Sequence, residues 1–258
     1  SRSATRLKGR WAPALTLRDP AQRLGFFQEQ RVDCWTVVKA PQRRSSGHCS
    51  LSGTMGNAAP APKVTLFVGW NGAGKTAVIQ RIRGRSSEPM PTTGVLKEQC
   101  TLRIGPESNS QECQMELIDV GSMPKLEAKV AAYSQYLANT DAVVIVLDAT
   151  RTCLKFRAEE VENAKALLQR ISRETEVRDK PFLVLANKCD REDALPIQEV
   201  LEVFDLEGVF KGRTWQLQRC SAITAEGLKA GVAWLVSKVL EEKKSTMQGM
   251  GSDGTVIR

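Results

Sequence analysis

The chain has 258 residues, a formal net charge of +8 and only 5% aromatic residues. Residues 1–54 hold 10 Lys and Arg against 3 Asp and Glu, whereas the rest of the chain holds 27 against 26. Because the larger part is almost neutral and poor in aromatic residues, we expect no nucleic-acid partner. No apolar run approaches the roughly 18 to 20 residues that span a bilayer. The seven cysteines include no Cys-x-x-Cys pair typical of zinc sites.

The first 62 residues mix arginine, glycine, serine and proline without a sustained helical or strand period. This composition predicts a basic, disordered N-terminal extension over residues 1–62. Met55 is a candidate natural start, which would make residues 1–54 upstream sequence. The alternative is a mitochondrial presequence, although the acidic residues Asp19, Glu29 and Asp33 argue against one.

The segment Gly69–Thr76 reads Gly-Trp-Asn-Gly-Ala-Gly-Lys-Thr and follows the apolar run Val64–Val68. A strand, this Gly-x-x-x-x-Gly-Lys-Thr pattern and a helix from Lys75 together predict a loop whose backbone N–H groups bind phosphates. The Lys75 ammonium would reach the terminal phosphates, and the Thr76 hydroxyl would ligate Mg²⁺ shared with the nucleotide. Alone, the motif indicates only a nucleoside phosphate, and a glycine-rich turn with an incidental Lys-Thr is the alternative. The nucleotide-binding residues predicted in this segment are Asn71, Gly72, Ala73, Gly74, Lys75, Thr76 and Ala77.

From residue 63 onward, predicted strands and helices alternate. Two strands of alternating polarity, about Val95–Ile104 and Glu112–Ile118, are joined by a turn. Two continuous apolar runs, Ala142–Leu147 and Phe182–Ala186, are typical of parallel strands that are buried on both faces. Helices with one apolar face separate the strands. The pattern predicts an α/β fold with an open parallel sheet, helices on both faces, and ligands at the carboxyl ends of the strands.

The sequence Asn187-Lys188-Cys189-Asp190 directly follows the second apolar run, at the edge where ligands of such a sheet bind. The Asp190 carboxylate can accept hydrogen bonds from the N1–H and the exocyclic amine of guanine, whereas adenine has no N1 proton. Lys188 would lay its aliphatic stem along the base, and Asn187 would tie this segment to the phosphate loop. By itself the motif is also compatible with an ordinary polar turn, and its position at a strand end favours guanine binding.

Two further motifs lie between the phosphate loop and the guanine motif. Asp119-Val120-Gly121 ends a predicted strand, where an aspartate can hold Mg²⁺ through a water molecule. Pro91-Thr92-Thr93-Gly94 precedes another strand, and the Thr92 hydroxyl could complete the magnesium shell when a third phosphate is present. Thr76 and Thr92 are therefore the predicted metal ligands. The four motifs follow one another in a consistent order at strand ends, which argues against coincidence.

These motifs resemble those of the small GTPases, and within them the ADP-ribosylation-factor-like (Arf-like) branch, over about Lys63–Glu242. Further matches are Ser221-Ala222 ahead of Gly227-Leu228, Trp215 near a strand start, and Ala233-Trp234-Leu235 in the last helix. The resemblance implies a P-loop NTPase fold of small GTPase type with a mostly parallel six-stranded sheet. It implies a GTPase domain over residues 63–242 and a flexible tail over 243–258. It also implies bound GTP or GDP with Mg²⁺, and places Ser221 and Ala222 in the nucleotide site, with the backbone N–H of Ala222 on the guanine carbonyl.

The resemblance further implies a molecular switch that cycles between GDP and GTP states and recruits effector proteins through the loops around Thr92 and Ser122. An exchange factor and a GTPase-activating protein would be its other partners. We expect a cytoplasmic monomer, and peripheral association with a membrane is left open. Gly56-Asn57 resembles a myristoylated N-terminus, but Pro60 occupies the position where serine or threonine is preferred.

Three residues depart from the family pattern. Ser122 replaces the usual glycine whose amide senses the third phosphate, Met123 replaces the usual glutamine that orients the attacking water, and Asn71 replaces a common aspartate. A thioether is a poor hydrogen-bond acceptor, so we expect slow intrinsic hydrolysis and assign no catalytic residue. The alternative is a GTP-binding scaffold without meaningful turnover. A P-loop kinase is a third hypothesis, but it gives no role to the Asn187–Asp190 motif.

Overall fold

The computed structural model describes residues 36–38, 61–85, 91–105, 110–123 and 125–248, all within the unit Asp33–Arg258. Side chains are described from residue 61 to 241 within these ranges. Met55, Gly56 and Pro60 lie outside the described residues. So does the rest of the predicted extension, apart from Thr36–Val38 and residues 61–62, and so does the chain beyond Gln248. None of the described helices is long and apolar enough to cross a membrane.

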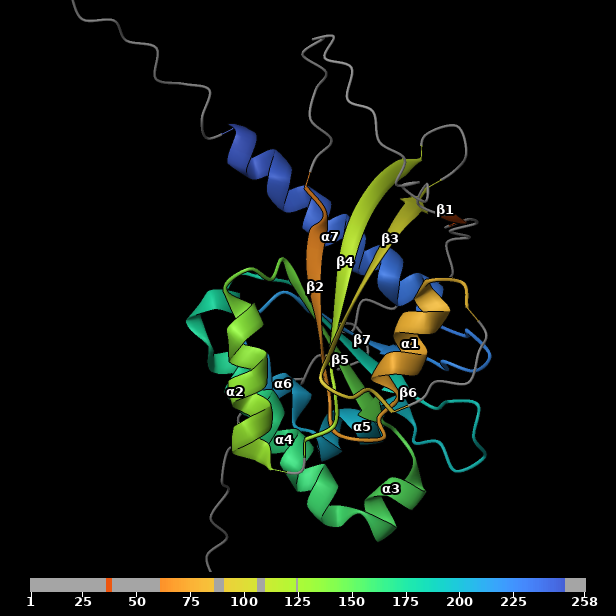
Figure 1. Cartoon of the computed structure of the whole chain (residues 1–258). Coiled ribbons are helices and arrows are strands. Elements are labelled where there is room, and N and C mark those ends of the chain that lie inside the picture. Colours follow the sequence, from red (N-terminus) through yellow and green to blue (C-terminus); the bar gives the residue numbers. More distant parts are fainter. Residues whose placement is uncertain (1–35, 39–60, 86–90, 106–109, 124, 249–258) are drawn as a thin grey trace, which may run out of the picture. The chain divides into compact units, whose positions relative to one another are not determined.

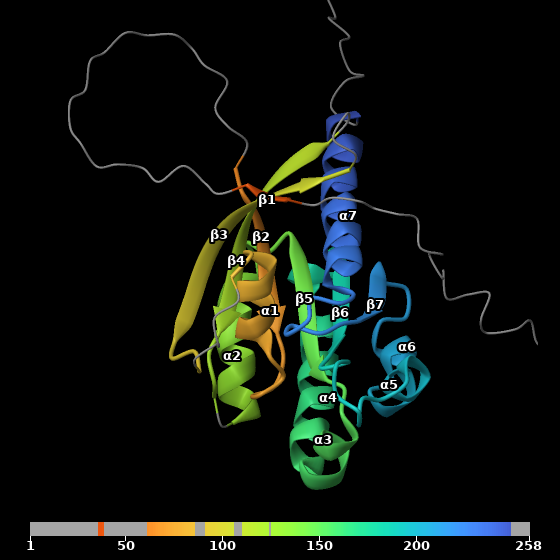
Figure 2. The same ribbon diagram turned by 90° about the vertical axis from the view of Figure 1, so that its right-hand side faces the viewer.

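The described strands form one sheet in the order β1-β3-β4-β2-β5-β6-β7, which Figure 2 shows for β3 to β7 in one view. Strands β4, β2, β5, β6 and β7 are parallel neighbours, whereas β1, β3 and β4 pair antiparallel. The predicted mostly parallel six-stranded sheet is confirmed, and β1 adds a short strand at its antiparallel edge. The strands are β1 Thr36–Val38, β2 Lys63–Val68, β3 Val95–Ile104, β4 Gln111–Val120, β5 Ala142–Asp148, β6 Phe182–Asn187 and β7 Trp215–Arg219.

Helices cover both faces of the sheet. Figure 1 shows α1 and α7 on one side and α2 and α4 on the other, in agreement with their contacts. Helix α7 continues to Gln248, six residues into the stretch that the sequence assigns to a tail. The helices are α1 Lys75–Ile82, α2 Leu126–Leu137, α3 Arg151–Phe156, α4 Ala158–Arg173, the 3-10 helix η3 Thr175–Val177, α5 Ile197–Val203, α6 Leu206–Val209 and α7 Leu228–Gln248.

The two central strands β5 and β6 are buried along their length, as expected for apolar strands that are covered on both faces. Their register pairs Asp148 with Asn187, and the register of β2 with β4 pairs Phe67 with Asp119. Parallel strands in register bring their carboxyl ends to one edge of the sheet. Asp119, Asp148 and Asn187 therefore lie at the same edge as the loop that follows β2.

Candidate nucleotide-binding site

The predicted phosphate loop Gly69–Thr76 connects β2 to α1. Gly74 stands at the N-terminal cap of α1 with φ 98°, a backbone conformation that side chains with a Cβ rarely adopt. A Cβ at Gly74 would also lie 2.4 Å from Nδ2 of Asn187. The loop therefore requires glycine here, and it ends in a helix N-terminus whose free N–H groups favour an anion. Ala77 lies in the first turn of α1 and packs against the core.

Lys75 turns its ammonium group back into the phosphate loop. Its Nζ donates to the carbonyl oxygens of Gly69 at 3.0 Å and Trp70 at 3.4 Å. Burial lowers the pKa of Lys75, and the negative charge of Asp119 opposes that shift. Two weak carbonyl contacts thus hold a cation that phosphate oxygens could bind more strongly.

Three oxygen-bearing side chains meet beside the loop. The carboxylate of Asp119, fully buried at the end of β4, accepts hydrogen bonds through Oδ2 from Thr76 at 2.5 Å and from Thr92 at 3.0 Å. The two hydroxyl oxygens are 2.7 Å apart. Oδ1 of Asp119 is buried and has no hydrogen-bond partner among the described residues. A set of hard oxygen donors with one unsatisfied carboxylate oxygen fits Mg²⁺.

The loops that contain Thr92 and Ser122 are joined by backbone hydrogen bonds. The Gly121 N–H donates to the carbonyl of Gly94 at 2.7 Å, and the Ser122 N–H donates to the carbonyl of Thr92 at 3.3 Å. A Cβ at Gly121 would lie 2.3 Å from the Thr92 oxygen, so this approach depends on glycine. The Ser122 amide therefore already has a partner, while the Ser122 side chain is exposed and Met123 is half-buried.

Asn187 connects three loops at the edge of the sheet. Its Nδ2 donates to the Ala73 carbonyl at 2.9 Å, which is the link to the phosphate loop that the sequence suggested. Its Oδ1 accepts the backbone N–H of Ala222 at 3.0 Å. That N–H is the group assigned to the guanine carbonyl by family resemblance, and in this structure it donates to Asn187. Ser221 is fully buried, and its hydroxyl accepts the N–H groups of Ile223 and Thr224, so it shapes the turn.

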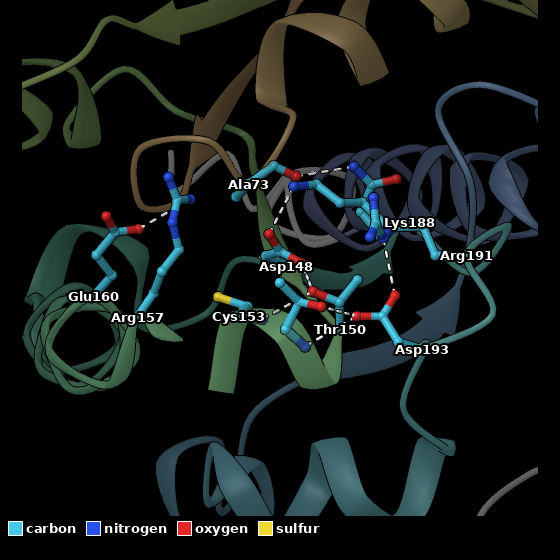
Figure 3. Close-up of polar contacts among 11 residues, drawn as sticks. Ala73, Asp148, Thr150, Cys153, Arg157, Glu160, Lys188, Arg191 and Asp193 are labelled. Carbon is cyan, nitrogen blue, oxygen red and sulfur yellow. Dashed lines mark hydrogen bonds and ion pairs between the residues drawn. The ribbon is translucent and has the colours of Figure 1, made fainter. Parts of the chain in front are cut away.

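The second residue of the predicted guanine-binding segment, Lys188, has a strained backbone. Lys188 has φ 70°, and its ammonium pairs with Oδ2 of Asp148 at 2.6 Å, which holds the aliphatic stem in place (Figure 3). Asp148 also accepts a hydrogen bond from Thr150 at 2.8 Å. Asp190 is exposed, so its carboxylate is accessible to a ligand. The ion pair thus fixes the Lys188 side chain, while the Asp190 carboxylate stays exposed.

Four residues of the site were not predicted from the sequence. Asp148 could have been found, because it directly follows an apolar run at the carboxyl end of a strand. Arg157 lies between α3 and α4 and forms an ion pair with Glu160 at 3.3 Å (Figure 3). Its guanidinium lies 3.1 Å from where a Cβ at Gly72 would stand. No local pattern marks Arg157, because only the packing of α4 brings it to the loop.

The other two, Lys129 and Tyr133, lie on α2 and are fully buried. The Tyr133 hydroxyl donates to the Gly69 carbonyl and accepts the Gly69 N–H, both at 3.3 Å, and burial raises its pKa. Lys129 Nζ donates to Oδ1 of Asn71 at 2.6 Å and lies 5.0 Å from the centroid of the Trp70 ring. The available signal was the helical spacing of Leu126, Lys129, Tyr133 and Leu137, with a lysine on the apolar face.

Burial is the main cause that lowers the pKa of Lys129 to about 7; Lys75 lowers it further and Asp119 opposes the shift. The charges of Lys75 and Lys129 therefore repel each other beside the phosphate loop. The fold and this loop define a P-loop nucleotide-binding protein, with a glycine-rich loop at a helix N-terminus, side-chain oxygens that fit Mg²⁺ and the predicted guanine-binding segment at the same sheet edge.

Comparison with known proteins narrows this class. The ADP-ribosylation factor family matches residues 58–239, and the chain belongs to that family of small GTPases. Human ADP-ribosylation factor-like protein 4D is 32% identical over 185 residues, covering 71% of this chain and 86% of that protein. Human ADP-ribosylation factor-like protein 4A is 29% identical over 184 residues, again 71% and 86% of the two chains.

The fold has a counterpart among solved structures. The Arl6 BBS3 small GTPase from Trypanosoma brucei, solved with the bound nucleotide analogue GppNp, superposes with a TM-score of 0.58. The two chains are 20% identical, and the match covers 70% of this chain and 99% of the other. At this identity the match supports a common fold.

Replacing Asn187 by alanine tests the connection between the loops. The change leaves the Ala73 carbonyl and the Ala222 N–H without their partner, which should lower the free energy of unfolding by about 2–4 kcal/mol. Urea unfolding of Asn187→Ala beside the wild type measures this. The control is Gln198→Ala, whose exposed amide bonds only Glu202 at 3.2 Å and should change stability by less than about 0.5 kcal/mol. Equal losses in both variants would contradict the assignment.

The pH dependence of stability tests the state of Lys129. Between its folded pKa of about 7 and the ordinary 10.5, the unfolded chain holds a proton that the folded chain lacks. The free energy of unfolding should therefore rise with pH across this window, by up to about 1.4 kcal/mol per pH unit from this group. Urea unfolding at pH 7.5 and 8.5 should give a smaller rise for Lys129→Met than for the wild type. Identical slopes would show that Lys129 keeps an ordinary pKa.

Proposed function

We propose that this chain is a guanine-nucleotide-binding switch of the Arf-like type that cycles between GDP and GTP states. The observation that carries the proposal is the convergence of two groups at one sheet edge. Thr76, Thr92 and Asp119 gather at the phosphate end, and the segment from Asn187 to Asp190 lies at the base end. The GTPase domain would comprise residues 63–242, between the extension 1–62 and the tail 243–258.

Each part of the site has a role in this proposal. The backbone of Gly72–Thr76 and the Lys75 ammonium would bind the phosphates, with Asn71 and Ala77 at the borders of the loop. Thr76 and Thr92 would hold Mg²⁺, which neutralises phosphate charge and fixes the geometry of the terminal phosphates. Asp190 would accept the guanine N1–H and amine, with Asn187, Lys188, Ser221 and Ala222 shaping the pocket.

The contacts of Thr92 and Ser122 support a switch. The Thr92 hydroxyl bonds the magnesium-side carboxylate, while its carbonyl accepts the Ser122 N–H. Loss of the third phosphate would release Thr92 from Mg²⁺, and the same movement would break its bond to Ser122. Effector proteins would read this change, and an exchange factor and a GTPase-activating protein would drive the cycle. We further propose a cytoplasmic monomer that associates peripherally with a membrane.

A second candidate function is a GTP-binding scaffold without meaningful turnover. Met123 supports it, because a thioether cannot orient water as an amide does. The Met123 carbonyl also accepts Nδ2 of Asn71 at 3.2 Å, which ties this position to the phosphate loop. A partner could still supply the catalytic group, since an arginine finger can act in trans.

Base selectivity tests the first proposal. Asp190→Asn keeps one acceptor but adds a donor, which suits the C2 carbonyl of xanthine and repels the amine of guanine. GTP affinity should fall by about 10–100-fold, and XTP affinity should rise. Equilibrium titration with fluorescent nucleotides measures both, and the exposed neighbour Glu192→Gln should leave them unchanged. ATP competing as well as GTP against the wild type would refute guanine recognition.

Single-turnover hydrolysis separates the switch from the scaffold. Met123→Gln introduces an amide that can position water, so the rate should rise about tenfold or more over a slow wild type. The assay follows GTP converted to GDP on the preloaded protein, and Lys125→Gln, at an exposed position two residues on, serves as the control. Fast hydrolysis by the unaided wild type would eliminate the scaffold.

A further inference from the structure

Lys129 is a lysine in an unusual place. It is fully buried in the first turns of α2, and its ammonium contacts two residues of the phosphate loop, Asn71 and Trp70. Neither contact carries a negative charge. Within the described ranges, no carboxylate forms an ion pair with Lys129. A buried cation is costly unless a counter-charge accompanies it. The charged form of Lys129 therefore needs an anion that the described residues do not supply.

The surroundings indicate which end of the nucleotide would supply the counter-charge. The charges that act on Lys129 are those of Lys75 from α1 and Asp119 from β4, and Tyr133 is the other titratable group of α2 beside the loop. Lys75 and the Mg²⁺ that the oxygens around Asp119 would hold both serve the terminal phosphates in a P-loop site. Asn71 in turn bonds the Met123 carbonyl, next to Ser122. Lys129 therefore lies at the terminal-phosphate end of the site.

We propose that Lys129 is a positioning residue that recognises the third phosphate from behind the loop, acting through Asn71 and taking up a proton when GTP, but not GDP, is bound. This inference rests on the proposed function. Lys129 does not line the site itself, because it is buried behind Asn71. The added negative charge of a third phosphate stabilises the ammonium form, and the proton comes from solvent. Lys129 thereby gives the chain a selectivity for the triphosphate that does not depend on Ser122 or Met123.

The pKa of Lys129, about 7 without nucleotide, determines how the test is designed. Above pH 7.5 the second ionisation of phosphate, near 6, is complete. Any further loss of GTP affinity as pH rises then reports a protein group. If GTP binding takes up a proton, its affinity should fall relative to GDP by up to about tenfold per pH unit.

The experiment compares the affinity of a non-hydrolysable GTP analogue with that of GDP, both with Mg²⁺, at pH 7.5 and 8.5. For the wild type, the preference for the triphosphate should fall as pH rises. Lys129→Met keeps an unbranched chain as far as Cε and removes the amine. For this variant, analogue affinity at pH 7.5 should be about tenfold weaker, GDP affinity should change less than about twofold, and the pH dependence should vanish. Lys125→Met removes a lysine at an exposed position beside the same helix and should behave as the wild type.

Calorimetry on the wild type gives a second measurement that does not depend on the variant folding. Titration at pH 8 in buffers of different ionisation enthalpy counts the protons taken up, and the analogue should take up more than GDP does. Parallel losses of GDP and analogue affinity in Lys129→Met, or equal proton uptake for both nucleotides, would overturn the inference. Failure of the wild type to bind either guanine nucleotide would instead overturn the proposed function.

Discussion

The hydrogen bonds of the Asp119 carboxylate hold the parts of this site together. The residue is fully buried at the end of β4, and the register of β4 with β2 places it beside the phosphate loop. A buried carboxylate is stable only when hydrogen bonds or a cation compensate it. Thr76 brings the phosphate loop to Asp119, and Thr92 brings the loop before β3 to the same oxygen. The remaining oxygen has no partner among the described residues, and a magnesium ion would satisfy it.

Lys129 is a buried amine that also lacks a compensating partner for its charged form. Asp119 has an unsatisfied carboxylate oxygen, and Lys129 has an ammonium without an ion pair in the described part of the chain. A magnesium nucleotide carries both complementary charges, because its metal suits Asp119 and its terminal phosphate suits Lys129. Without nucleotide, Asp119 keeps an unsatisfied oxygen and burial favours the neutral form of Lys129. We interpret this as a reason for the chain to bind its nucleotide as a charged complex.

Much of the fold was predictable because its signals are local. The boundaries of β3 agree with the predicted Val95–Ile104, and the apolar runs became the buried strands β5 and β6. Helix α2 was not assigned, because Lys129 interrupts its apolar face and weakens the helical pattern. Strand β1 has only three residues; their β-branched side chains favour a strand, but so short a segment is recognised only through its pairing with β3.

The sequence by itself determined the phosphate loop, because strand, glycine pattern and helix are adjacent in the chain and constrain one another directly. It also predicted the guanine-binding segment from its position after a strand. It also revealed the departures at Asn71, Ser122 and Met123. Only the tertiary structure decided which side chains support these motifs. Tyr133 reaches Gly69 across 64 residues, and Lys129 reaches Asn71 across 58. Such contacts depend on the packing of whole elements against the sheet, so no local pattern contains them.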